Sequence, residues 1–275
     1  MPGAESNVAG QSAPVADMTG WVHEPFTAAG FTHDVYRKGE GPGVLLIPEI
    51  PGIHPGGFAL GNYLVDNGFS VAIPSLYGTP GAPSMTPAMV PVLARACVSN
   101  EFAAFATNKD RPVSHYLRAL ARDLKEKAGS KGVGVIGQCF SGGFALAAAV
   151  DDSVLASVLS QPSVPMGLTA KQKRDPGLSE GELKVIEKRA AEDGLCALGL
   201  RFSRDPMSPA ERFKTLKDRL GDAFEVIELD SSRGNAAGFG PLAHSVLSLE
   251  VREVDGHPAY EARKRVVQFL KDQLT

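Results

Sequence analysis

The stretch Val133-Gly134-Val135-Ile136-Gly137-Gln138-Cys139-Phe140-Ser141-Gly142-Gly143-Phe144-Ala145-Leu146-Ala147 has the clearest pattern in this chain. It begins with a short apolar run, which is typical of a buried strand, and ends in apolar residues that favour a helix. Between the two, small residues stand two positions before Cys139 and again from Ser141 onward. A strained turn needs small residues there because it brings neighbouring backbone segments close together. The stretch therefore predicts a strand, a sharp turn and a helix, with Cys139 on the turn.

Apolar runs and helical patterns alternate on both sides of this stretch. Strands are expected at residues 31–36, 44–47, 69–73, 132–136, 155–159, 196–202 and 224–229. Helices are expected at 58–67, 114–127, 142–150, 179–192, 209–220 and 258–273, and Ser179 with Glu182 forms a capping box at the start of one of them. Strands that alternate with helices indicate a mostly parallel central sheet that helices cover on both faces. Together with the turn at Cys139, this order predicts the α/β class and the α/β-hydrolase fold.

We expect one folded domain with a loose N-terminal extension. Residues 1–20 are rich in Gly, Ala, Ser and Pro and are expected to be a flexible tail, whereas residues 21–275 are expected to form a single α/β-hydrolase domain. Two stretches interrupt the alternation of strands and helices. Residues 84–111 are expected to be an insertion that caps a pocket. Residues 230–256 form a long glycine-rich segment, and such segments in compact domains are usually functional or disordered.

Composition and charge narrow the class of protein. The 275 residues carry 28 Lys and Arg against 31 Asp and Glu, a formal net charge of −3, which provides no basic field for nucleic acid. No apolar stretch approaches the roughly 20 residues that are needed to cross a bilayer. The first residues also lack the basic and apolar regions of a signal peptide. We therefore expect a cytoplasmic protein with neither a nucleic-acid partner nor a membrane partner.

The cysteines and histidines do not have the spacing of a metal site. Cys97, Cys139 and Cys196 are odd in number and widely separated, which fits free thiols in a reducing compartment. No Cys or His pair has zinc-finger spacing, and no dinucleotide-binding or phosphate-binding fingerprint is found. We therefore expect the protein to need no metal and no organic cofactor.

Cys139 is the predicted nucleophile, because the turn exposes its side chain at the start of a helix. The helix N-terminus favours a thiolate there, and the amide of Phe140 is placed to donate to an oxyanion. One alternative is that Cys139 is only a small apolar residue in a tight crossover. Another is that Ser141 is the nucleophile, although it lies too far past Ile136, where the strand is expected to end.

A thiol nucleophile needs a histidine to move its proton and an acid to orient that histidine. Asp205 follows the strand at 196–202, at the edge where open α/β sheets bind ligands, although it could simply begin a turn. Two histidines come late enough in the chain, His244 in the long loop and His257 directly before Pro258. The positive end of a helix dipole opposes formation of imidazolium at His257, which favours His244. The remaining histidines precede or miss the expected position: His23, His33, His54 and His115.

With these residues placed, the chain resembles the dienelactone hydrolase family, thiol members of the α/β-hydrolase superfamily, from about Phe31 to Leu274. Besides the turn, the segments that carry the resemblance are Ile47-Pro48-Glu49-Ile50-Pro51-Gly52, Pro74-Ser75-Leu76-Tyr77, Asp205 with Pro209-Ala210, and His244-Ser245. The resemblance implies that Glu49 hydrogen-bonds the resting Cys139 and helps it to ionise. It also implies that the amides of Ile50 and Phe140 form an oxyanion hole and that Tyr77 contacts the substrate. The alternative for Glu49 is a solvated loop acid.

The sequence departs from the family pattern where the archetype grips a substrate carboxylate with two arginines. Gly78-Thr79 and Ser248 stand near those places. We therefore expect a substrate other than dienelactone itself, and a more apolar pocket built by residues 84–111.

Taken together, the sequence predicts hydrolysis of a small-molecule ester or lactone through Cys139, His244 and Asp205 and a covalent thioester intermediate. The protein is expected to act as a monomer or a homodimer. An amidotransferase-like or DJ-1-like protein is one alternative, since both present a cysteine on a similar turn. A non-catalytic member of the fold that only binds a small ligand is another.

Overall fold

The computed structural model describes residues 17–275 except 85 and 88. Within them, eight strands form one sheet in the order β1-β2-β4-β3-β5-β6-β7-β8. The strands are β1 Val22–Ala28, β2 Phe31–Lys38, β3 Gly43–Ile47, β4 Ser70–Pro74, β5 Val133–Gln138, β6 Val154–Ser160, β7 Cys196–Phe202 and β8 Phe224–Leu229. The β1–β2 and β2–β4 pairs are antiparallel, and every other neighbouring pair is parallel. This confirms the prediction of a mostly parallel sheet.

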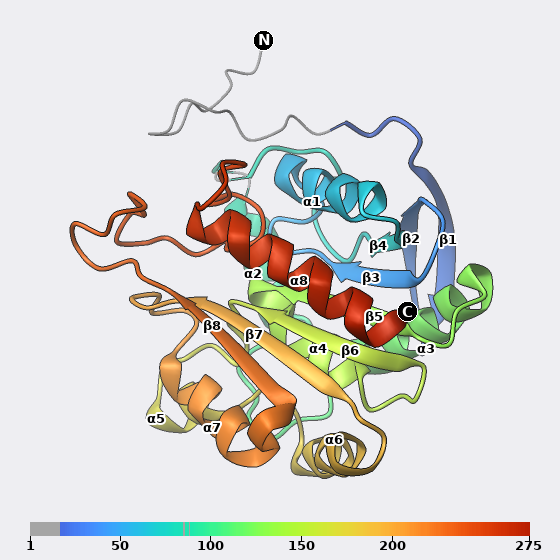
Figure 1. Ribbon diagram of the computed structural model, residues 1–275. Coiled ribbons are helices and arrows are strands. Elements are labelled where there is room, and N and C mark those ends of the chain that lie inside the picture. The colour runs from blue at the N-terminus through green and yellow to red at the C-terminus, as the bar shows by residue number, and fades with distance from the viewer. Residues whose placement is uncertain (1–16, 85, 88) are drawn as a thin grey trace.

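Helices cover both faces of this sheet (Figure 1). They are α1 Pro55–Asp66, α2 Met89–Val98, α3 Pro112–Ala128, α4 Gly142–Ala148, α5 Ala170–Arg174, α6 Glu180–Glu192, α7 Ala210–Leu220 and α8 Pro258–Leu274, with short 3-10 helices η1 Cys139–Ser141 and η2 Gly221–Ala223. One buried cluster joins α1 and α8 to the sheet, and a second joins α3, α4, α6 and α7 to its opposite face. Burial of these two apolar layers is the main driving force for the fold.

Local signals agree with the observed elements in detail. The strands at 196–202 and 224–229 have the predicted bounds, and the other predicted strands and helices are present with ends shifted by a few residues. At the start of α6, the Ser179 hydroxyl accepts a hydrogen bond from the Glu182 amide at 3.2 Å, and the Glu182 carboxylate accepts one from the Ser179 amide at 2.8 Å. The predicted capping box is therefore confirmed.

Strand β1 and helix α5 are among the elements that the sequence did not predict. Strand β1 lies at the edge of the sheet with mostly exposed side chains, so its sequence has no apolar alternation. The five-residue helix α5 has no buried residue at all. Both elements lack the buried face that makes a strand or helix recognisable in a sequence.

Residue 17 is the first residue that the structure describes. Residues 1–16 of the expected tail lie outside the described residues, and packing begins at Trp21, whose ring meets Phe58 edge to face with 5.6 Å between centroids. None of the helices in the described part of the chain combines the length and apolar character that a membrane span needs.

The parallel strands place the predicted site residues at one edge of the sheet. Glu49 and Ile50 follow β3, Cys139 follows β5, Asp205 follows β7, and His244 lies in the segment after β8. Because β3, β5, β7 and β8 all run in the same direction, their carboxyl ends meet at this edge, where ligands bind in open α/β sheets.

Candidate active site

Cys139 lies on a strained turn between β5 and α4. Its φ is +51°, a value that side chains other than glycine rarely adopt. The neighbouring glycines allow this turn: a Cβ on Gly137 would lie 2.3 Å from the Ser141 carbonyl oxygen, and one on Gly142 would lie 2.6 Å from the Cα of Pro162. No side chain fits at either position without a shift of the backbone. The predicted strand, turn and helix around Cys139 are therefore present.

Ser141 has a structural position inside the turn. Its side chain is fully buried, and its hydroxyl oxygen lies 2.9 Å from the Pro48 carbonyl, 3.1 Å from that of Ile47 and 2.9 Å from that of Gln138. It also accepts the Gln138 amide at 3.1 Å. The Ser141 hydroxyl therefore links the turn to the end of β3. The side chain that the turn leaves accessible is that of Cys139, which is half-buried.

Asp205 and His244 form a hydrogen bond between two loops. The distance from His244 Nδ1 to Asp205 Oδ2 is 2.6 Å, and Asp205 is almost completely buried. The other oxygen, Oδ1, accepts the Met207 amide at 2.9 Å, which fixes the carboxylate within its own loop. With Nδ1 donating to Asp205, the Nε2 atom of a neutral His244 is left as an acceptor. That Nε2 is buried and has no hydrogen-bond partner in the described part of the chain.

Asp205 and Cys139 both affect the protonation of His244. Burial alone would lower the pKa of His244, but Cys139 and the hydrogen bond with Asp205 outweigh it and raise the pKa well above its ordinary value. A raised pKa favours the imidazolium, which is the form that a histidine takes when it accepts a proton from a thiol.

Glu49 is a buried carboxylate with four side-chain donors. They are His54 Nε2 at 3.0 Å, Ser245 Oγ at 2.7 Å, Gln161 Nε2 at 3.4 Å and Ser248 Oγ. Burial would raise the pKa of Glu49, but the hydrogen bond from His54, with those from Ser248 and Ser245, outweighs it and lowers the pKa to about 2. Glu49 is therefore an ionised internal group and not a solvated loop acid.

The hydrogen bond expected between Glu49 and Cys139 is not found among the described residues. The Cys139 sulfur instead accepts a long hydrogen bond from Ser163 Oγ at 3.8 Å. Ser248, which stands near the place of an arginine in the family archetype, is one of the four donors to Glu49. The carboxylate is saturated by these donors, which leaves it no free lone pair directed at the thiol.

The two expected oxyanion donors belong to different loops, Ile50 to the one after β3 and Phe140 to the turn after β5. Phe140 is the second residue of η1, where helical geometry leaves an amide without an intrahelical acceptor. Ile50 follows Glu49 in a tight turn in which the Gly52 amide donates to the Glu49 carbonyl at 2.7 Å, and its own amide donates to none of the described residues. Both amides are available to a ligand oxygen.

A cavity of about 500 Å³ lies under α2, next to the turn. Tyr77 and Phe102 line it, and both rings pack against Phe140, with centroids 6.0 and 5.6 Å away. The Tyr77 hydroxyl donates to the Pro48 carbonyl at 2.6 Å. Tyr77 was expected to contact the substrate, and only its ring is free to do so. The rest of the lining is Ser75, Leu76, Gly78, Thr79, Val92, Arg95, Ala96, Ser99 and Glu101.

This lining corrects the expectation of a more apolar pocket. Residues between Val92 and Phe102 line this cavity, but hydroxyl and charged groups make up most of its polar wall. The reason is the orientation of α2, which buries only Ala96 and leaves apolar residues such as Val90 and Val98 facing outward.

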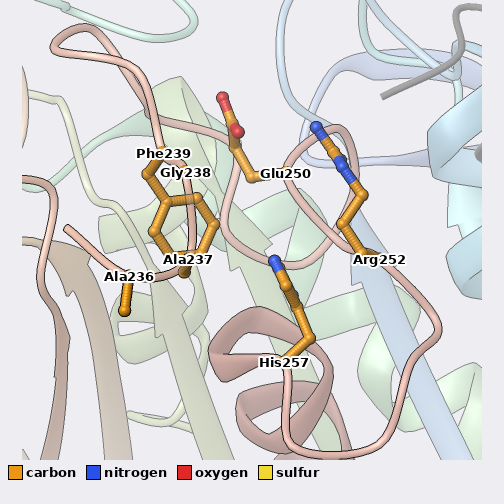
Figure 2. A pocket seen from close by; sticks show the side chains of 7 residues that line it. All are labelled: Ala236, Ala237, Gly238, Phe239, Glu250, Arg252 and His257. Atoms are coloured by element: carbon orange, nitrogen blue, oxygen red, sulfur yellow. The ribbon is translucent and has the colours of Figure 1, made fainter. Parts of the chain in front are cut away.

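A second cavity of about 300 Å³ lies in the loop after β8, and His257 lines it (Figure 2). Glu250 and Arg252 lie beside it, and the guanidinium of Arg252 donates to the carbonyls of Leu249 and Val251 at 2.9 and 3.0 Å. Burial and the charge of Arg252 lower the pKa of His257. The structure therefore brings His244, and not His257, to Asp205.

Several residues of this site were not recognised in the sequence. They are His54, Gln161, Ser163, Ser245 and Ser248. A weak signal existed for His54, which directly precedes Pro55 at a helix start. In the described residues, no group of three or more His, Cys, Asp or Glu side chains is arranged to hold a metal ion.

Comparison with known proteins gives a consistent result. The sequence model of the dienelactone hydrolase family matches residues 31–273. No curated protein sequence matches the chain. A dienelactone hydrolase-like promiscuous phosphotriesterase from metagenomic libraries has a similar structure, with 16% identity, a TM-score of 0.62 and coverage of 93% of this chain and 98% of that chain.

Two further solved structures are similar. A dienelactone hydrolase from Anabaena variabilis has 12% identity and a TM-score of 0.59, covering 93% of this chain and 98% of its own. An esterase from Pyrococcus furiosus has 15% identity and a TM-score of 0.56, covering 92% of each chain. At these identities the likeness shows the fold, which confirms the predicted α/β-hydrolase architecture.

Proposed function

Because the chain belongs to the dienelactone hydrolase family, and is thus a hydrolase of ester bonds, we propose that it cleaves an ester or lactone of a small molecule through Cys139, His244 and Asp205. The observation that carries this proposal is the 2.6 Å bond between Asp205 and His244, which leaves His244 Nε2 with no other hydrogen-bond partner among the described residues. These are the three roles that thiol acyl transfer requires: nucleophile, base and orienting acid.

In the first half of the reaction, His244 Nε2 takes the thiol proton and the Cys139 sulfur attacks the carbonyl carbon. The carbonyl π electrons move to oxygen, and the amides of Ile50 and Phe140 donate to this oxyanion. When the carbonyl re-forms, the C–O bond to the alcohol breaks and the imidazolium returns its proton to the leaving oxygen. The product is a thioester on Cys139, with the alcohol released, or still tethered to the acyl chain in a lactone.

In the second half, water replaces the alcohol. His244 Nε2 takes a proton from the water as its oxygen attacks the thioester carbon, and the same two amides hold the second oxyanion. Collapse breaks the C–S bond, and the sulfur leaves as a thiolate that recovers the proton from the imidazolium. A carboxylic acid is released and the resting state is restored.

The proposal is tested by hydrolysis of p-nitrophenyl esters and small lactones by the wild type and by Cys139→Ala. We expect loss of turnover in the variant, and we expect mass spectrometry of quenched wild type to show an acyl group on the peptide that contains Cys139. A matched control is Cys196→Ala, because burial raises the pKa of that thiol and it lies at the start of β7, away from the turn. Full activity in Cys139→Ala would reject the scheme, and release of ammonia from glutamine would favour an amidotransferase.

A further inference from the structure

We propose that His54 is a positioning residue of this site: it holds Glu49, and through Glu49 it fixes both the Ile50 amide and the loop that carries His244. The inference rests on the proposed function, because it concerns the oxyanion donor and the base of that reaction. His54 lies five residues after Glu49, and the contacts of its ring are what distinguish it from the other histidines.

The ring of His54 is fixed on both sides. It is 1% exposed and stands at the N-cap of α1, where Nδ1 accepts the Gly56 amide at 3.1 Å. A ring nitrogen that accepts an N–H carries no hydrogen in that state, so Nε2 carries the proton and donates to Glu49 Oε1 at 3.0 Å. The backbone of α1 thus selects the one tautomer that can hold the carboxylate.

Glu49 transmits this constraint to the loop after β8. The Ser248 hydroxyl donates to Oε1, and the Ser245 hydroxyl donates to Oε2 at 2.7 Å. Gln161 Nε2 also donates to Oε2 at 3.4 Å, while its own Oε1 accepts the Val246 amide at 3.3 Å. One buried carboxylate therefore holds the segment 245–248 by two direct bonds and one that passes through Gln161.

Both functional groups are adjacent to this carboxylate along the chain. Ile50 directly follows Glu49, and His244 directly precedes Ser245. A shift of Glu49 would move the oxyanion donor and the base relative to the sulfur of Cys139. Reaction rates depend steeply on such displacements. None of these hydrogen bonds involves a residue that lines the cavity under α2. The expected effect is on kcat and not on KM.

Two substitutions of His54 separate its two hydrogen bonds. His54→Asn keeps a side-chain acceptor at the N-cap, where Asn is favoured, but is too short to reach Glu49. His54→Gln places an amide N–H near the position of Nε2, so it keeps a donor to Glu49 and gives up the cap. We expect His54→Asn to lower kcat by roughly 10- to 100-fold with KM within about twofold of wild type, and His54→Gln to recover most of that loss.

The pH profile provides a further readout. If Glu49 served as the proton acceptor of Cys139, the loss of a hydrogen bond to Glu49 in either variant would move the acid limb of the pH profile of kcat/KM. If it only positions the loops, His54→Asn and Ser248→Ala lower the plateau and leave the acid limb in place. Ser248→Ala is the second test of the same carboxylate, from the opposite side, and it applies even if His54→Asn does not fold.

The outcomes distinguish this inference from the proposed function. If Cys139→Ala is inactive and His54→Asn and Ser248→Ala both keep the kcat of wild type, the role of His54 is wrong while the proposed function stands. Equal kcat losses in His54→Asn and His54→Gln that follow their thermal stabilities would also overturn it, because they would indicate a purely structural effect. An active Cys139→Ala would reject the proposed function itself.

Discussion

His244 is bonded to Asp205 through Nδ1, at 2.6 Å, although the two residues are 39 positions apart. The bond joins the loop after β7 to the loop after β8 and leaves one ring nitrogen of His244 without a partner in the described part of the chain. The parallel order of β5, β7 and β8 brings this pair to the same edge as Cys139.

His244→Ala should lower kcat by about 10³-fold or more, since it removes the group that accepts the thiol proton and returns it to the leaving oxygen. His257→Ala should change kcat by less than about fivefold, because His257 lines a separate cavity and does not contact Asp205. Steady-state kinetics on one ester would compare them. A larger loss in His257→Ala would assign the base to that residue.

Asp205→Asn should lower kcat by about 10²- to 10⁴-fold while the protein remains folded, because an amide in place of Oδ2 can favour the wrong tautomer of His244. Asp222→Asn serves as the control, since Asp222 is fully exposed in η2. Circular dichroism would verify folding, and the ratio of the two kcat values gives the effect. Equal activity of the two variants would remove Asp205 from the mechanism.

Glu49→Gln should reduce stability at neutral pH by up to roughly 3 kcal/mol, because the pKa of Glu49 is about 2 in the folded protein and 4.5 otherwise. The folded pKa is depressed, so this stabilisation is present above pH 4.5 and is lost as the pH falls from 4.5 toward 2. Urea unfolding of wild type and variant at several pH values would show their difference shrinking over that range. A difference that stays constant with pH would contradict the prediction.

Gly137→Ala should destabilise the protein strongly, because the new methyl would lie 2.3 Å from the backbone oxygen of Ser141 and the backbone of the turn would have to move. Gly181→Ala in α6 is the matched control, since nothing lies within 4 Å of its added methyl. In a helix this change is expected to be neutral or stabilising by up to about 1 kcal/mol. Thermal unfolding would measure both, and equal melting temperatures would contradict the steric account.

The sequence was sufficient for the parts of this molecule that are determined locally. The turn at Cys139 follows from the glycine at 137 and the small residues at 141–143, and β3 follows from the continuous apolar run at 44–47. Asp205 and His244 could be placed because chain order and strand ends indicate which loops meet. Strand β1 could not be predicted, because an exposed edge strand pairs through its backbone and needs no apolar pattern.

The partners of Glu49 could not be predicted for a different reason. Ser245 and Ser248 lie 196 and 199 positions away, and no local pattern marks a serine that will bond a distant carboxylate. The polarity of the cavity under α2 could not be predicted either, because it depends on which side of that helix faces inward. These properties belong to the assembled chain and not to any short segment of it.

The segment between β8 and α8 contains neither helix nor strand, yet it supplies the imidazole. It is held to the core by buried apolar side chains such as Val246 and Leu247 and by the hydrogen bonds of Ser245 and Ser248. Segments of this kind open locally at a lower free energy than the sheet that carries them. On warming or in dilute urea, this hydrolase should therefore stop working while its far-ultraviolet signal still reports an intact fold. The temperature limit of the activity would then be set by the opening of this segment, and that of the fold by the sheet and its helices.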